Sequence, residues 1–72
     1  MTITVNGVEK NITKGIMTYE DIVKLAEGKE GVLYTVTFTR GMLRHRSGTL
    51  SPGTFVPVVP RMIFNVVQAE SA

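Results

Sequence analysis

The dipeptide Asn6-Gly7 constrains the fold of this 72-residue chain more than any other feature, because it separates two runs of alternating residues. Asn-Gly favours a two-residue type I′ turn, in which both central residues need a positive φ. That turn places Val5 opposite Val8, and the apolar residues of both runs then share one face: Met1, Ile3, Val5, Val8 and Ile12. Lys10 is the exception on this face, and a lysine on an edge strand can extend its charge into water. The chain is expected to begin with a β-hairpin.

The stretch MTYEDIVKLAEG carries the signals of a short helix, about Tyr19 to Glu27. Thr18 is a suitable N-cap, and Asp21 three residues later completes a variant capping box. Gly28 is expected to end the helix. A helix of fewer than three turns is marginal by itself, so it is expected to pack on a sheet.

Three later segments have strand character: Leu33 to Thr39, the short TFVPV stretch, and about Met62 to Gln68. Pro57 lacks an amide donor, which places the TFVPV strand at an edge. From Arg40 to Gly53 the sequence is typical of a loop, within which MLRHR could form a short strand and Leu50 is expected to enter the core.

The order of hairpin, helix and further strands predicts an α+β protein with one helix crossing a mixed sheet. This is the β-grasp (ubiquitin-like) arrangement, and one domain is expected to fill residues 1–72. The nearest alternative is a small five-stranded barrel, which lacks a natural place for a capped helix after the first hairpin.

The composition excludes several kinds of site. No cysteine is present, the single His45 lies between Arg44 and Arg46, and the glycines do not form a phosphate-binding loop. We therefore expect no catalytic residue, metal or cofactor, and an exposed His45. No apolar run reaches the roughly 18 residues of a membrane span, and no signal peptide precedes the hairpin, so a cytoplasmic protein is the expectation.

Two surfaces could bind partners. The first is a basic loop with Arg40, Arg44 and Arg46, which could contact an acidic protein or, as a weaker alternative, nucleic acid. The second is the outer face of the last strand. If its even-numbered residues face the helix, the odd-numbered ones form an apolar patch on the open face: Ile63, Asn65 and Val67.

The segments MTITVNGVEKNIT, TYEDIVKLAEG, YTVTFTRG, LSPG and MIFNV, in this order and spacing, resemble one module of the bacterial multiubiquitin-type ubiquitin-like proteins. The resemblance covers nearly the whole chain. It implies a protein modifier of a bacterial or phage-encoded conjugation system, forming isopeptide bonds through its C-terminal carboxylate. The implied partners are an E1-like activating enzyme, an E2-like conjugating enzyme and a processing or deconjugating peptidase.

By the same resemblance, Asn65 and Val67 correspond to the recognition patch of ubiquitin. The conjugation tail would be a flexible segment within residues 67–72, comprising Gln68, Ala69, Glu70, Ser71 and Ala72. Ubiquitin and the sulfur carriers of its fold end in Gly-Gly, which is missing here, and this disfavours a sulfur-carrier role. Two alternatives stay open: a ubiquitin-like interaction module that is never conjugated, and a small nucleic-acid-binding domain that uses the Arg40–Arg46 loop.

Overall fold

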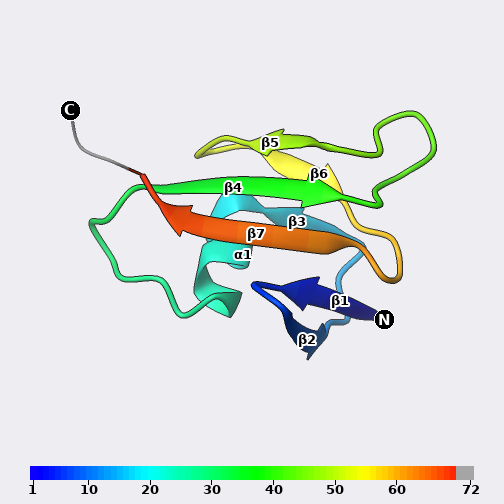
Figure 1. Ribbon diagram of the computed structural model, residues 1–72, viewed down its shortest axis with the longest axis horizontal. Helices are drawn as coiled ribbons and strands as arrows, with labels where there is room; N and C mark the ends of the chain where they lie inside the picture. The colour runs from blue at the N-terminus through cyan, green and yellow to red at the C-terminus, as the bar shows by residue number, and fades with distance from the viewer. Residues whose placement is uncertain (70–72) are drawn as a thin grey trace.

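The computed structural model of the protein describes residues 1–69, which form seven strands and one helix (Figure 1). The elements in chain order are β1 (Thr2–Val5), β2 (Val8–Asn11), β3 (Ile16–Thr18), α1 (Tyr19–Leu25), β4 (Tyr34–Thr39), β5 (Gly48–Leu50), β6 (Phe55–Pro57) and β7 (Ile63–Gln68).

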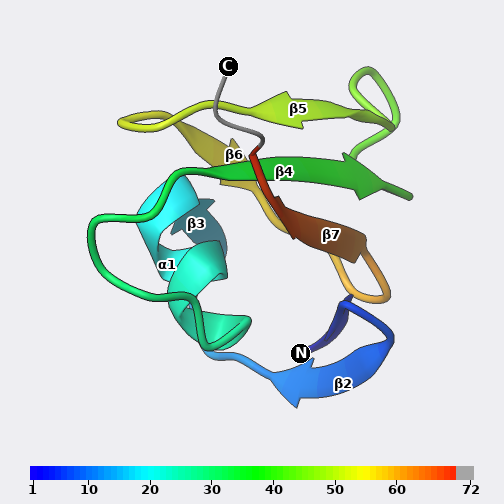
Figure 2. The same cartoon turned by 60° about the vertical axis from the view of Figure 1, so that its left-hand side comes forward.

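The main sheet has five strands in the order β2-β1-β7-β4-β5, and β3 and β6 form a separate two-stranded sheet. The last strand, β7, lies parallel to β1 and antiparallel to β4, so the sheet is mixed. Helix α1 covers one face, and the opposite face is open toward the viewer in Figure 1 (see also Figure 2). This is the predicted β-grasp fold. The sheet ends at β2 and β5 instead of closing, so the barrel alternative is wrong.

The first hairpin has the predicted register, with Val5 opposite Val8 and Ile3 opposite Lys10. Asn6 and Gly7 adopt φ values of 51° and 79°, as a type I′ turn requires. The predicted core face is only partly correct, because Val8 is 54% exposed. Helix α1 packs mainly against β3, β4 and β7, and the start of the edge strand β2 lies outside this contact.

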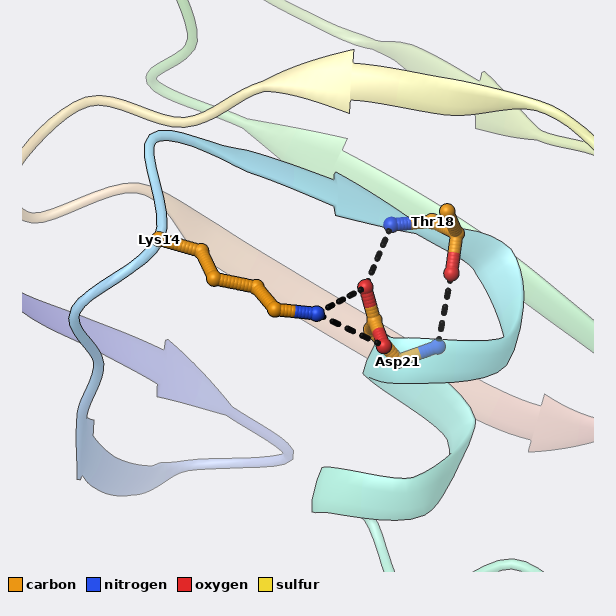
Figure 3. A network of polar contacts seen from close by, with 3 residues as sticks. All are labelled: Lys14, Thr18 and Asp21. Atoms are coloured by element: carbon orange, nitrogen blue, oxygen red, sulfur yellow. Dashed lines mark hydrogen bonds and ion pairs between the residues drawn. The ribbon is translucent and has the colours of Figure 1, made fainter.

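The N-terminus of the helix has the predicted capping box (Figure 3). The Thr18 hydroxyl oxygen accepts a hydrogen bond from the Asp21 N–H (3.0 Å), and the Asp21 carboxylate accepts one from the Thr18 N–H (3.1 Å). The Lys14 ammonium lies 3.3 Å from the same carboxylate. The backbone hydrogen bond from Thr18, assisted by Lys14, lowers the pKa of Asp21 below its ordinary value of 3.8.

The helix ends at Leu25, two residues before the predicted end, and Gly28 has a different role from the one expected. Glu27, with a φ of 59°, is the left-handed residue of the C-terminal turn. The Gly28 N–H then donates to the Val23 carbonyl oxygen (2.9 Å), as in a Schellman motif. A Cβ on residue 28 would lie 2.4 Å from a Val23 side-chain carbon, so glycine is needed here for close approach.

A single apolar core lies between the helix and the sheet. No polar or charged residue among the described ones is buried. Leu50 belongs to this core, as predicted. Its fourteen members are Ile3, Val5, Ile12, Met17, Tyr19, Ile22, Val36, Phe38, Leu50, Val56, Val58, Met62, Phe64 and Val66.

Strand β3 was not predicted, and the short strand after β4 lies later in the chain than predicted. Residues 16–18 pair with β6, so the Pro57 strand is at an edge as predicted, but in the smaller sheet. The MLRHR segment is a tight turn with one bridge between Met42 and His45, and the strand β5 comes after it. A Cβ on Gly41 would lie 2.5 Å from the His45 carbonyl oxygen, and this close approach lets the chain turn early.

Candidate functional site

Strand β7 is the central strand of the main sheet, and its two faces differ sharply. Phe64 and Val66 point into the core and are 0% and 8% exposed. The odd-numbered residues lie on the open face, as predicted. Of these, Ile63 is half-buried, Asn65 is exposed, and Val67 is 63% exposed.

The neighbours of these residues on the open face are threonines. The register places Thr35 opposite Val67, Thr37 opposite Asn65, and Thr39 opposite Ile63. The open face is therefore largely polar but uncharged along β4, and Val67 is the exposed apolar side chain that faces this row of hydroxyl groups.

A second exposed apolar residue lies beside Val67 and was not included in the predicted surface. Leu33 is 60% exposed, and its carbonyl oxygen accepts a hydrogen bond from the Ala69 N–H (2.9 Å). This bond extends the β4–β7 ladder by one pair, so Leu33 and Val67 are diagonal neighbours on one face. The period-two alternation of β4, continued back from Thr35, is the sequence signal that identifies Leu33. We call Leu33 and Val67 the root patch.

The predicted conjugation tail falls into two parts. Gln68 is the last residue of β7, opposite Tyr34, and Ala69 is held to Leu33 by the hydrogen bond described above. Residues 67–69 are thus part of the paired sheet. Glu70, Ser71 and Ala72 lie outside the described residues.

Two side chains fix the end of the sheet that carries the root patch. The Asn6 amide donates to the Val66 carbonyl oxygen (3.1 Å) and accepts from the Val66 N–H (2.8 Å), as a backbone partner would. The Tyr19 hydroxyl donates to the Tyr34 carbonyl oxygen (3.0 Å) and accepts from the Tyr34 N–H (2.8 Å). The hairpin turn and the start of the helix therefore both anchor the strands beneath the root patch.

The basic loop is divided by the turn after β4. Arg44 lies within the turn, beside the 84% exposed Leu43, and the Arg46 carbonyl oxygen accepts from the Gly41 N–H (2.8 Å). Arg40 precedes this turn and lines a hollow on the open face instead. His45 is exposed, as predicted, and its ring lies 5.3 Å from that of Phe38.

Within residues 1–69, no group of three or more His, Cys, Asp or Glu side chains could hold a metal ion. In the same part of the chain, no helix is long and apolar enough to cross a membrane. What this surface does offer is an apolar patch where the last strand ends and a separate hollow with basic walls, which are features of binding.

Comparison with known protein families gives one match, to the family described as multiubiquitin, over residues 1–69. Comparisons with curated proteins and with solved structures give no match. The matched segment begins with the hairpin and ends at Ala69, and therefore includes every strand of the β-grasp and the root patch. With this match and this fold, the chain belongs to the multiubiquitin family and contains a ubiquitin-like domain.

Proposed function

We propose that this domain is a ubiquitin-like modifier that is activated and conjugated through a carboxylate at the end of the segment after β7. In this proposal, the carboxylate attacks the α-phosphate of ATP in an E1-like enzyme and releases pyrophosphate. A cysteine thiolate then displaces AMP, and an E2-like cysteine accepts the resulting thioester. A peptidase releases or removes the modifier. The domain itself supplies no catalytic side chain.

The position of the root patch is the observation that carries the proposal. An enzyme that binds the segment after Ala69 must approach the end of the sheet at which β7 ends, where the root patch lies. Leu33 and Val67 expose apolar surface there, at 60% and 63% exposure. Burying the exposed part of such side chains in an enzyme contributes about 1–2 kcal/mol each. The patch can therefore orient the segment that bears the carboxylate.

The test is activation by a candidate E1-like enzyme in the presence of Mg-ATP, followed by intact mass spectrometry for the adenylate and the thioester. We expect Val67→Thr to slow activation by about fivefold or more, because about 1 kcal/mol of apolar contact is lost. The matched control is Val8→Thr, which makes the same change at a strand valine that is 54% exposed at the sheet edge. Equal effects of the two changes would contradict the role of the root patch.

A second candidate function uses the same patch without conjugation, as an interaction module. Removal of residues 70–72 separates the two functions, because it leaves all the paired residues through Ala69 in place. A modifier loses activation in this variant. An interaction module keeps its partner binding and shows no adenylate with either form of the chain.

A further inference from the structure

The open face has a second feature at the end of the sheet opposite the root patch. A shallow hollow of about 350 Å³ lies over the beginning of β1 and β7 and the end of β4. Ile63 is the one apolar residue of its walls. The other lining residues are polar or charged: Thr2, Thr4, Glu9, Arg40 and Arg61. The proposed function does not use this hollow.

The two arginines reach the hollow from neighbouring strands. Arg40 follows the last residue of β4, and Arg61 is separated from the start of β7 by Met62 alone. Since β4 and β7 are antiparallel, the C-terminal end of β4 lies beside the N-terminal end of β7, at the same end of the sheet (Figure 1). The Arg61 N–H also donates to the Thr2 carbonyl oxygen (2.8 Å), which holds this turn against β1.

Both arginines have a left-handed backbone, with φ values of 58° at Arg40 and 68° at Arg61. Glycine adopts this conformation without strain, whereas a residue with a Cβ does so at a cost. Strained residues of this kind are concentrated at functional sites. Two of them line the same hollow, and both carry a long cationic side chain.

The charges around the hollow are not balanced within the domain. Among residues 1–69 the ion pair joins Lys14 to Asp21, so neither arginine has a described carboxylate at ion-pair distance. Glu9 is the one acidic residue of the walls and comes from the edge strand β2. The lining thus has two positive charges against one negative charge, and its net positive potential attracts an anionic group.

We propose that this hollow binds a glutamate or aspartate side chain in an extended acidic segment of a partner protein. The guanidinium groups of Arg40 and Arg61 donate hydrogen bonds to the carboxylate, a geometry for which arginine is well suited. Ile63 offers an apolar contact for the methylene carbons of the bound side chain. The hydroxyls of Thr2 and Thr4 can bond the backbone of the segment.

The experiment follows the amide signals of the ¹⁵N-labelled chain during titration with a capped heptapeptide that has glutamate at every second position. A peptide with glutamine at those positions is the negative probe. We expect saturable shifts at Thr2, Thr4, Arg40 and Arg61 with the glutamate peptide only. Arg40→Gln and Arg61→Gln should each weaken binding about fivefold or more, as for loss of a charge-assisted hydrogen bond.

Two further variants make the result specific. Arg46→Gln removes the same charge from the turn outside the hollow and should leave the affinity nearly unchanged. Glu9→Gln removes the negative charge that repels the bound carboxylate and should tighten binding by about two- to threefold. A thermal melt of each variant confirms that it is folded.

Several outcomes would overturn the proposal. An equal loss of affinity in Arg46→Gln would assign binding to general charge or to the loop. Weaker binding in Glu9→Gln would contradict the predicted sign. Saturable binding of inorganic phosphate without binding of the glutamate peptide would make the site one for phosphate, not for carboxylate. If neither the glutamate peptide nor inorganic phosphate gave saturable shifts, the hollow would not be an anion-binding site.

Discussion

The two faces of the main sheet are made from the same strands, yet they follow different rules. On the helix side, Val36, Phe64 and Val66 are almost completely buried and leave little room for another side chain. On the open side, the same strands carry threonines, Asn65 and a few exposed apolar residues. The buried face determines whether the chain folds. The open face contributes little to stability. Substitutions on it therefore cost little folding free energy and can alter binding.

The largest difference between the faces is expected at two adjacent residues of β7. Phe64→Ala removes a fully buried ring and should lower the free energy of unfolding by about 3–5 kcal/mol, measured by urea denaturation. Asn65→Ala, one position along on the open face, should change it by less than about 0.5 kcal/mol. Similar losses at both positions would mean that the two faces are not energetically distinct.

A somewhat smaller effect is expected at Asn6, which joins the first turn to the central strand. Asn6→Ala removes both hydrogen bonds to Val66 and puts a poorer residue in the left-handed position, which should cost about 1–3 kcal/mol. Asn6→Gly keeps the turn and removes only the hydrogen bonds, so it should cost less. If Asn6→Gly and Asn6→Ala lower the unfolding free energy equally, the left-handed conformation of residue 6 makes no measurable contribution to the loss.

The helix that covers the buried face depends on its capping box, and Asp21 makes this contribution dependent on pH. The pKa of Asp21 is lowered in the folded state, so its stabilisation is complete above the unfolded pKa of about 4 and is lost as the pH falls through the folded pKa. The difference in unfolding free energy between the wild type and Asp21→Asn should therefore be largest near neutral pH.

The control for this prediction is Thr18→Ala, which removes the other half of the capping box. It should cost about 1 kcal/mol, with a weaker dependence on pH than Asp21→Asn, because the Asp21 carboxylate keeps its hydrogen bond from the Thr18 N–H and its ion pair with Lys14. A gap between the wild type and Asp21→Asn that stays constant from neutral to strongly acidic pH would contradict the assignment to the Asp21 charge.

The smallest effects on stability are expected on the open face, where they should follow exposure. Ile63 is half-buried between Thr4 and Thr39, whereas Val67 is 63% exposed. Ile63→Thr should lower the unfolding free energy by about 1 kcal/mol, and Val67→Thr by less than about 0.5 kcal/mol. Thermal melts of both variants test this order. A larger loss at Val67 would show that the root patch stabilises the fold.

Features encoded by nearby residues could be predicted from the sequence. The Asn6-Gly7 turn fixes the register of the hairpin, and Thr18 with Asp21 fixes the start of the helix, because each depends on residues only a few positions apart. The alternating face of β7 was also predicted correctly, since period-two patterns directly specify which residues share a side.

Features that depend on distant residues could not be predicted. Strand β3 has only three residues and no local pattern strong enough to assign it, and its pairing partner β6, which was predicted as a strand, is far along the chain. The hollow has the same origin, because Arg61 contributes to a site only after β7 brings it beside Arg40 and β1. Leu33 was predicted as the first residue of its strand, whereas β4 begins at Tyr34, and its position beside Val67 follows from the observed register alone.

The position of β7 also has a consequence for the order in which the domain can be completed. Its hydrogen bonds to Asn6 join residues that are 60 positions apart in the sequence. The first hairpin and β4 lie on opposite sides of β7, and without it no strand of the main sheet connects them. A chain emerging from the ribosome can thus form the hairpin early, but the sheet remains in two separate halves until the last strand has been synthesised.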